Sequence, residues 1–382
     1  MRYIKIGFMC LCLNCSTSLL AQVEESPLKI FGYFQNSLQH WTGFSEMKRY
    51  NSFSLQQLNI FMQKDLGNRW TTFLNVEFLN SFSTQDRWGA MKVDEAWVKY
   101  DLSRTASLKM GLMIPIFNNL NDIKNKTPLL PYIIRPIAYE SSFGEFLNLN
   151  VLTPNQAFIQ LYGFIPRDKL KLDYAFYVGN SPNIAKTSEF AQSGIDTTTT
   201  FMVGGRVGVR YKEVKLGFSA TYDLDSEFQY AAAGLEKPAS VLQERPRTRL
   251  AGDFSFHKER WNWESEVIFA DLSEGVEEFE IDLNFYYGTL GYELTDNLYA
   301  YYSYWRWDEH FDLDGSLYKT YNDGRIHGTT AGIAFQAHDY IRLKLQAVRV
   351  YYRAENEELL SGFYEKKKEN FSIFSVGISA HY

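Results

Sequence analysis

The lengths of the gaps between short alternating segments constrain the fold of this chain more than any other feature. From about residue 28, the chain divides into about sixteen segments of roughly ten residues in which apolar and polar side chains alternate. Short gaps fall at Asp65–Asn68, Leu102–Thr105, Pro166–Lys169, Lys212–Glu213, His257–Arg260, Glu293–Asn297 and His338–Asp339, and long gaps include Asn118–Asn155, Asn180–Thr200, Asp223–Arg247, Asp308–Arg325 and Arg353–Asn370. The two kinds of gap alternate along the chain, which indicates strands that cross a layer back and forth, with tight turns on one side and long loops on the other.

The segments themselves have the period of two that is expected when the two faces of a strand meet different surroundings. In the segment 341–347, Leu343 and Leu345 alternate with Arg342 and Lys344, and the segments 203–211 and 249–256 alternate in the same way. A membrane offers no water to free backbone polar groups, so a sheet spans it only as a closed barrel. We therefore predict an all-β fold, a closed antiparallel transmembrane β-barrel of about 16 strands with short periplasmic turns and long extracellular loops.

Both ends of the chain agree with this fold. Residues 1–21 contain Arg2 and Lys5, then a short apolar stretch and Leu-Leu-Ala, which is the pattern of a secretory signal peptide. We expect it to be removed, leaving 22–382 as a barrel with no plug domain. The alternatives are a membrane anchor, for which the apolar stretch is too short, and a lipoprotein signal at Cys15. The last segment has apolar residues at every second position and ends on Tyr382, like the final strand of bacterial outer-membrane proteins.

The composition supports a barrel rather than a bundle of membrane helices. The mean hydropathy is −0.30, which excludes a helical membrane protein but suits strands in which only alternate residues are apolar. Aromatic residues make up 16% of the chain, and rings favour the boundary between membrane and water. We expect Tyr299–Tyr302, Tyr304, Trp305 and Trp307 to form part of such an aromatic girdle, with burial in a core as the alternative.

One long loop is unlike the others. Leu108–Ile114 is the expected fifth strand and the sixth begins near Gln156, so about forty residues separate them, too many for an ordinary loop. The segment is apolar, and its prolines disfavour a regular helix. We predict that this third long loop folds into the lumen, where its charged residues form the pore constriction and Arg135 faces Glu140 or Glu145. These constriction residues are Lys124, Lys126, Arg135, Glu140 and Glu145. A lid over the mouth or a contact with a partner subunit is the alternative.

The period of two also assigns side chains to the lumen wall. The charged residues predicted to point inward are Arg206, Arg210, Arg249, Asp253, Glu264, Glu266, Arg342 and Lys344, together with Glu77, Glu95, Lys99, Lys215 and Asp282. If Asp282 points into the lumen, the apolar residues that alternate with it in the segment 281–287 point toward lipid. Charges inside a pore set its ion preference, and the mixture of signs predicts weak selectivity. A wall salt bridge is the alternative role for each residue taken singly.

Catalytic and cofactor sites find little support. None of the six histidines lies in a nucleophile motif or a paired metal-binding motif, and all three cysteines lie within 1–21. The run Lys366–Lys368 is too short to indicate nucleic-acid binding in a chain of net charge −6. We therefore expect no enzyme activity, no metal and no cofactor.

The chain resembles porins of the phosphate-selective porin O and P type, most closely those of Bacteroidota. The resemblance rests on Lys109-Met110-Gly111-Leu112 followed by Pro115-Ile116-Phe117, on the segment Thr127–Pro136, on the sixteen-strand rhythm and on the terminal Tyr382. It implies a trimeric channel whose third loop forms the constriction. Anion-selective members line their pore with arginines and lysines, and the partial equivalent here is Arg206, Arg210, Arg249, Arg342 and Lys344.

Together these features predict a porin that forms a passive, water-filled diffusion channel for small hydrophilic solutes or ions. We expect it in the outer membrane of a Gram-negative bacterium, in contact with outer-membrane lipid, with both termini periplasmic and as a homotrimer. A sealed barrel with a structural or surface-binding role is the alternative, followed by an outer-membrane barrel enzyme.

Overall fold

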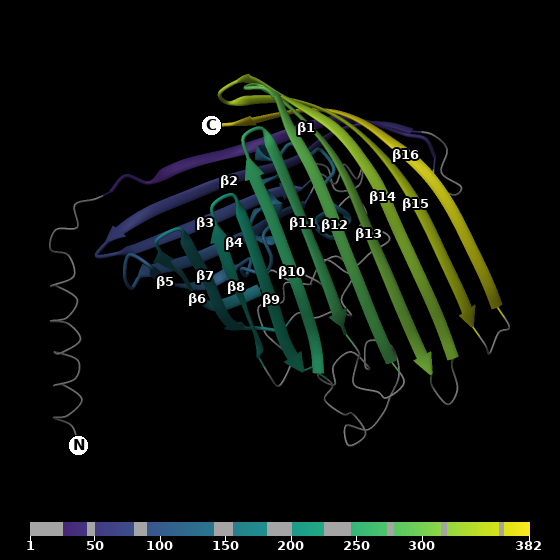
Figure 1. Ribbon diagram of the computed structural model, residues 1–382, viewed down its shortest axis with the longest axis horizontal. Helices are drawn as coiled ribbons and strands as arrows, with labels where there is room; N and C mark the ends of the chain where they lie inside the picture. Colours follow the sequence, from purple (N-terminus) through teal and green to yellow (C-terminus); the bar gives the residue numbers. More distant parts are fainter. Residues whose placement is uncertain are drawn as a thin grey trace, which may run out of the picture.

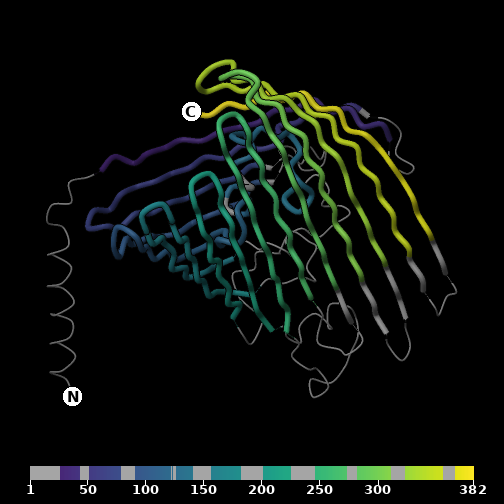
Figure 2. Tube along the Cα trace, viewed as in Figure 1, coloured from purple at the N-terminus to yellow at the C-terminus, as the bar shows by residue number. Residues whose placement is uncertain are grey.

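The computed structural model describes residues 26–43, 50–79, 90–140, 156–181, 201–224, 246–272, 279–314, 319–358 and 363–382. Within these ranges sixteen antiparallel strands form one closed barrel, in which each strand pairs with its neighbours in sequence and the first pairs with the last. Figures 1 and 2 show these two strands side by side where the barrel closes. The predicted fold class is therefore confirmed. The predicted signal peptide lies outside the described residues.

The strands vary in length around the barrel. They are β1 (Lys29–Trp41), β2 (Tyr50–Gly67), β3 (Trp70–Leu79), β4 (Ala90–Asp101), β5 (Ala106–Met113), β6 (Gln156–Arg167), β7 (Leu170–Gly179), β8 (Met202–Tyr211), β9 (Val214–Leu224), β10 (Pro246–Lys258), β11 (Trp261–Asp271), β12 (Phe279–Thr295), β13 (Leu298–Asp314), β14 (Lys319–His338), β15 (Ile341–Glu358) and β16 (Phe363–His381). Two short 3₁₀ helices, η2 (Asn121–Leu129) and η3 (Ile137–Tyr139), follow β5. In the part of the chain that the structure describes, no helix is long and apolar enough to cross a membrane.

The seven predicted short turns all join consecutive strands, and they gather at one end of the barrel (Figure 1). Several have only two residues, and Asn68, Asp168 and Lys212 adopt positive φ angles of 50°, 46° and 50° in them. This left-handed conformation matches the twist of the strands that a two-residue hairpin joins. The chain also ends here, where the backbone of Tyr382 pairs with that of Gly32. A Cβ atom on Gly32 would lie 2.7 Å from the Tyr382 hydroxyl, so glycine leaves room for the terminal ring.

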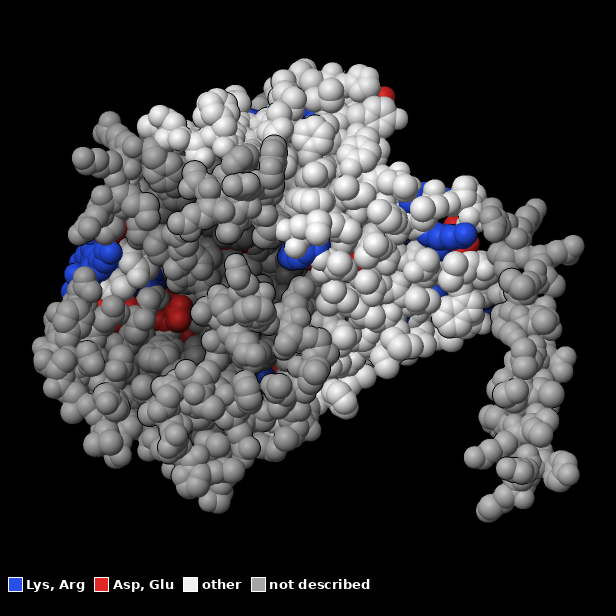
Figure 3. Space-filling model, turned by 180° about the vertical axis from the view of Figure 1, so that it is seen from behind, with Lys and Arg blue, Asp and Glu red and all other residues white. Residues whose placement is uncertain are grey.

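The two faces of most strands differ as predicted. On β15, Leu343 and Leu345 are exposed on the outer face whereas Lys344 and Gln346 are buried on the inner face. On β8 and β10, Arg206 and Arg249 likewise point inward and are buried. Most of the described surface on the side shown in Figure 3 is uncharged. The barrel therefore has the apolar outer wall and polar inner wall of a membrane-spanning barrel.

On two adjacent strands the predicted orientation is wrong. Leu283 and Phe285 of β12 are buried on the inner face, whereas Asp282 is exposed on the outer face. On β13, Trp305 and Trp307 are 0% and 1% exposed, so they belong to an internal core and not to an aromatic girdle. A Cβ atom on Gly328, which pairs with Trp305, would lie 2.4 Å from its ring, so this glycine makes room for the indole inside the barrel.

Candidate functional site: the lumen and its inner belt

Residues 114–140 lie inside the barrel, and we call this segment the inner belt. Most of its apolar side chains are buried, with Ile133, Ile134 and Ile137 between 0% and 2% exposed, whereas Leu129 is 43% exposed. They form one hydrophobic cluster with wall residues of β1 and of β10–β16, including Phe285, Trp305 and Trp307. The long third loop thus folds into the lumen, as predicted. The apolar wall of β12 and β13 faces inward because the belt covers it there.

The belt follows the wall around the barrel. The Ile116 N–H donates to Gln160 of β6 (3.0 Å), and the Asn118 N–H donates to Ser219 of β9 (3.0 Å). Farther along, the belt bonds to β11, then to β15, and at Ile133 to β1 and β2. Up to Ile133, successive belt residues bond to successive parts of the circumference. The belt then turns back, and Tyr139 bonds to Glu266 of β11 again. These bonds hold the belt against the wall at several points.

Glu266 of β11 anchors the first part of the belt. Its carboxylate accepts the backbone N–H groups of Asn119 (3.0 Å) and Leu120 (2.6 Å) and the Tyr139 hydroxyl (2.5 Å). Burial and the neighbouring carboxylate raise the pKa of Tyr139 well above its ordinary value, so the hydroxyl keeps its proton and donates. Hydrogen bonds to a charged acceptor are stronger than those between neutral groups. This carboxylate therefore binds the belt at two points far apart in its sequence.

Lys344 of β15 anchors the belt near its middle. Its ammonium lies within hydrogen-bond distance of four acceptors, the backbone carbonyl oxygens of Thr127 (3.0 Å), Pro128 (3.2 Å) and Tyr132 (3.0 Å) and Gln35 Oε1 (2.5 Å), which together satisfy its three N–H donors. These oxygens take the place of the water molecules that the ammonium loses on burial. They therefore lower the free-energy cost of burying its charge. Next to it, Arg342 donates to the carbonyl of Leu129 (2.5 Å). Both predicted wall cations therefore hold the belt.

Neutral glutamines complete the anchoring. Gln346 Oε1 accepts the N–H groups of Ile133 (2.9 Å) and Ile134 (2.6 Å), while its Nε2 donates to the Ile134 carbonyl (2.7 Å). Gln56 donates to the carbonyl of Ile133 (2.6 Å). Opposite the Ile133 side chain stands Gly377, on which a Cβ atom would come within 3.1 Å. Sequence reasoning did not find these residues, because a lumen-facing glutamine looks like any other polar wall position.

The structure describes some of the predicted constriction residues. Arg135 contacts Glu140 on the same belt, through its backbone N–H (2.8 Å) and its Nε (3.4 Å), and both side chains are buried. Lys126 is half-buried at the end of η2. Glu145 lies outside the described residues, as does the side chain of Lys124. That this part of the belt forms the narrowest point of the lumen stays a prediction.

Several predicted wall charges pair with one another. Arg206 and Asp253 form a two-point ion pair (2.9 and 2.7 Å), and both are buried. Arg249 lies 3.9 Å from Asp223, which also forms a two-point pair with Arg247 (2.9 and 3.1 Å). Sequence reasoning missed this last pair because it placed Asp223 and Arg247 in a loop. Asp223 and Arg247 continue the inward-facing alternate positions of β9 and β10 and pair with each other in the register. That alternation is the signal that would have found them.

On the first strands the predicted inward charges also have partners. Glu77 contacts Lys92 (2.8 Å), Glu95 accepts from the Trp97 indole (3.0 Å), and Lys99 contacts Asp101 (3.2 Å). Glu264 of β11 lines a cavity of about 300 Å³ between the tip of the belt and the short-turn end of β12 and β13. Tyr132 of the belt also lines this cavity, and burial raises its pKa well above the ordinary value.

A row of cations lies on the inner wall near the short-turn end. Lys171, Arg210 and Lys215 are directly opposite one another on β7, β8 and β9. Lys215 donates to Asn119 of the belt (2.6 Å) and Lys171 lies 3.7 Å from Asp173, while Arg210 is exposed. Like charges directly opposite destabilise a sheet, so this row costs stability. We call it the inner cation row.

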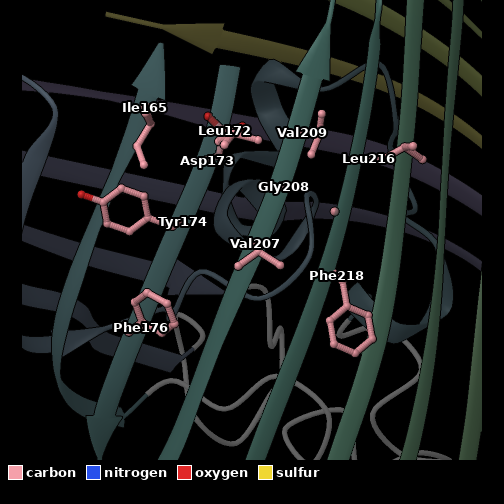
Figure 4. Close-up of a pocket in the computed structure, with 11 residues that line it drawn as sticks. Ile165, Leu172, Asp173, Tyr174, Phe176, Val207, Gly208, Val209, Leu216 and Phe218 are labelled. Carbon is pink, nitrogen blue, oxygen red and sulfur yellow. The ribbon is translucent and has the colours of Figure 1, made fainter. Parts of the chain in front are cut away.

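A shallow hollow of about 580 Å³ lies on the outer wall over β6–β9, and Figure 4 shows side chains such as Phe176, Val207 and Phe218 around it. These residues are exposed on the apolar outer face, which suits contact with lipid chains. Among the described residues, no group of three or more His, Cys, Asp and Glu is placed to hold a metal ion.

Comparison with solved structures shows that this barrel has a fold like that of outer-membrane porins. An anion-selective porin from Comamonas acidovorans matches with 12% identity and a TM-score of 0.58, covering 94% of this chain and 100% of that one. The outer-membrane channel DcaP of Acinetobacter baumannii matches with 10% identity and a TM-score of 0.60, covering 93% and 97%. OprB of Pseudomonas putida matches with 10% identity and a TM-score of 0.56, covering 93% and 94%. No protein-family model and no curated protein matches the sequence.

Proposed function

We propose that this protein is an outer-membrane porin that forms a passive, water-filled diffusion channel for small hydrophilic solutes or ions. The observation that carries the proposal is the path of the inner belt. A sixteen-strand barrel is too wide for wall side chains alone to fill. The belt narrows it while bonded to the wall, so an aqueous path can remain beside the belt. The fold shared with known porins supports the same conclusion.

The proposal includes the location and assembly expected from the sequence. Residues 1–21 would direct export, and the short turns and both termini would face the periplasm, with the long loops outside. The protein would assemble as a homotrimer. The resemblance to porins of the phosphate-selective O and P type stays a proposal about ancestry and supplies no substrate.

The ion preference follows from which wall charges are compensated. Arg206 is neutralised by Asp253, and Asp223 lies between Arg247 and Arg249. The exposed Arg210 in the inner cation row adds positive charge near the short-turn end. We propose weak selectivity with a modest preference for anions.

Single-channel recording in a planar bilayer tests the proposal. Purified protein should produce discrete conductance steps in KCl. A variant that lacks Leu129–Pro136, the tip of the belt, serves as the comparison. If the intact protein does not conduct and the deletion variant does, the barrel is sealed by its belt and the structural alternative replaces the channel. If neither conducts although both are folded, the diffusion-channel proposal is wrong.

A further inference from the structure

The cavity of about 300 Å³ at the tip of the inner belt is lined by charges of both signs, and we call it the turn-end cavity. Its charged lining residues are Glu264 of β11, Glu293 of β12, Asp296 of the following turn and Arg342 of β15. Its volume is at the lower end of the range of about 300–1,000 Å³ that is usual for small-molecule sites. The cavity is therefore large enough for a small solute, and its charges decide which kind.

Two carboxylates of the turn-end cavity differ from others on the lumen wall. Asp253 and Asp223 each form an ion pair with an arginine of the wall. Within the described part of the chain, neither Glu264 nor Glu293 forms an ion pair. Glu264 is hydrogen-bonded by Asn262, which is neutral. A half-buried carboxylate without a cation costs free energy, and a cation that enters the cavity would lower this cost.

Other charged groups near the cavity are engaged elsewhere. Lys215 of the inner cation row lies in the same cross-strand row as Glu264, with Ser255 between them. Its ammonium, however, donates to Asn119 Oδ1 of the belt at 2.6 Å. The exposed Asp296 lies 3.8 Å from Arg260 on the neighbouring turn. The two unpaired carboxylates are thus the negative charges that the cavity offers to a solute.

Arg342 supplies a positive charge on the β15 side of the cavity. Its Nε donates to Gln336 Oε1 (2.9 Å), and its Nη1 donates to the carbonyl of Leu129 (2.5 Å). Both acceptors are neutral, so they do not balance its charge. A guanidinium has five N–H donors, and these two bonds leave Nη2 for a further acceptor. The planar guanidinium suits a carboxylate in particular.

The lining between the two charged sides is aromatic and apolar. Across the strands, Glu293 pairs with Tyr299, and Tyr299 pairs with Ala334 next to β15. The belt adds Leu130 and Pro131, which are half-buried. Three strand spacings, about 14 Å, separate the backbones of β12 and β15. Because the charged side chains of both strands line the cavity between them, the gap that a solute has to span is shorter than this.

We propose that the turn-end cavity binds a zwitterionic solute, an amino acid or a small peptide. Glu264 and Glu293 bind its ammonium group, Arg342 binds its carboxylate, and Leu130 and Pro131 contact its apolar part. A solute with only one of the two charges leaves one side of the cavity without a counter-charge. This inference rests on the proposed channel function and deepens it, because it names a class of solute that the lumen recognises.

Binding of leucine and of two singly charged analogues tests the proposal. The analogues are 3-methylbutylamine, which is leucine without its carboxylate, and 4-methylpentanoate, which is leucine without its ammonium group. Each is titrated against the purified full-length protein in detergent and followed by saturation-transfer NMR of the solute. The variant E264Q/E293Q removes both carboxylates of the cavity. The control E213Q/E259Q makes the same change of charge at two exposed glutamates of neighbouring short turns.

The original protein and the control should bind leucine about tenfold more tightly than E264Q/E293Q does, because a hydrogen-bonded charge pair is lost. The original protein should also prefer leucine to either analogue by about tenfold. Equal binding of leucine by E264Q/E293Q and the control would overturn the proposal. Binding of 3-methylbutylamine as tight as that of leucine would also overturn it, because the site would then recognise cations alone.

Two further measurements make the result unambiguous. Heat-dependent migration on gels verifies that each variant is folded. Conductance recorded on the same preparations separates the two proposals. A protein that conducts but does not prefer leucine refutes the zwitterion site alone, whereas one that binds leucine but does not conduct refutes the channel alone.

Discussion

Replacing Gln346 by Met should loosen the inner belt without changing the volume of the wall side chain much. Gln346 makes three hydrogen bonds to the backbone of Ile133 and Ile134, at 2.9, 2.6 and 2.7 Å. A bond between neutral groups contributes about 1 kcal/mol net, so the loss is about 3 kcal/mol. Backbone groups of Ile133 and Ile134 that are left without a partner raise this loss of free energy. Water that enters from the lumen and bonds to them lowers it. Since 1.4 kcal/mol corresponds to a factor of ten, the undocked fraction of the belt should rise about a hundredfold.

Thiol labelling measures that fraction. The three native cysteines lie within residues 1–21, so in a chain that begins at residue 22 a cysteine placed at Ile134, which is 2% exposed, would be the single thiol. Its reaction rate with a hydrophilic maleimide reports how often the belt leaves the wall. The matched control is Gln39→Met, because Gln39 also faces the lumen but bonds to Ser37 and Trp41 of its own strand.

The expected result is faster labelling by about two orders of magnitude in Gln346→Met and little change in Gln39→Met. Slow labelling in both variants would show that Gln346 does not hold the belt. Fast labelling in both would point to a general loosening of the barrel. Either result would refute the assignment of the docking energy to these three bonds.

Further predictions concern the pore and the wall. Deleting Leu129–Pro136 should raise single-channel conductance several-fold, and an unchanged conductance would mean that this tip does not narrow the path. Arg210→Glu should shift the zero-current potential in a KCl gradient toward cation preference, whereas Lys212→Glu on the exposed turn should shift it less; equal shifts would contradict a role for the inner cation row. Arg206→Leu should lower the free energy of unfolding in urea by about 3–5 kcal/mol, because it leaves a buried carboxylate unpaired, and adding Asp253→Leu should recover part of the loss. No recovery would show that the ion pair does not explain the cost.

The sequence predicted the barrel because its signals are local. A period of two and a two-residue turn such as Lys212–Glu213 depend on neighbouring residues, so most strands and all seven short turns could be predicted. The predicted long gaps Asp308–Arg325 and Arg353–Asn370 were wrong, because β13–β16 extend through most of them. The third loop could be predicted to fold inward because its apolar residues needed burial. Arg135 and Glu140 could be paired because they are only five residues apart on a proline-rich segment.

The orientation of β12 and β13 could not be predicted from the same rule. Alternation tells which residues share a face, but it does not tell which face points inward. We placed Leu283 and Phe285 toward lipid because we assumed a polar lumen, whereas the inner belt makes the lumen wall apolar there. On the other face, Asp282 and Asn284 are exposed near the long-loop end of β12, beyond the apolar part of its outer face. Their strands extend beyond the membrane, so polarity on the outer face was no guide.

The anchors of the belt escaped prediction for a related reason. Gln35, Gln346 and Lys344 act together only because register places β1 and β15 on either side of β16. Their partners are backbone carbonyl and N–H groups of the belt. Almost every residue carries these groups, so the sequence does not show which of them will bind a side chain. Only the folded chain shows that a lysine expected to line the pore is instead fully bonded inside the belt.

The apolar wall and the inner belt explain each other, and together they argue against a belt that swings away as a gate. If the belt left the wall, the side chains of Phe285, Trp305 and Trp307 would face the water of the lumen, and so would Ile133 and Ile134 of the belt. Exposing each such side chain costs about 1.5–3 kcal/mol, before any hydrogen bond to Lys344 or Glu266 is lost. Five of them amount to about 7–15 kcal/mol, comparable with the stability of a whole domain. The belt is therefore a fixed part of the wall, and solutes would pass beside it and not by displacing it.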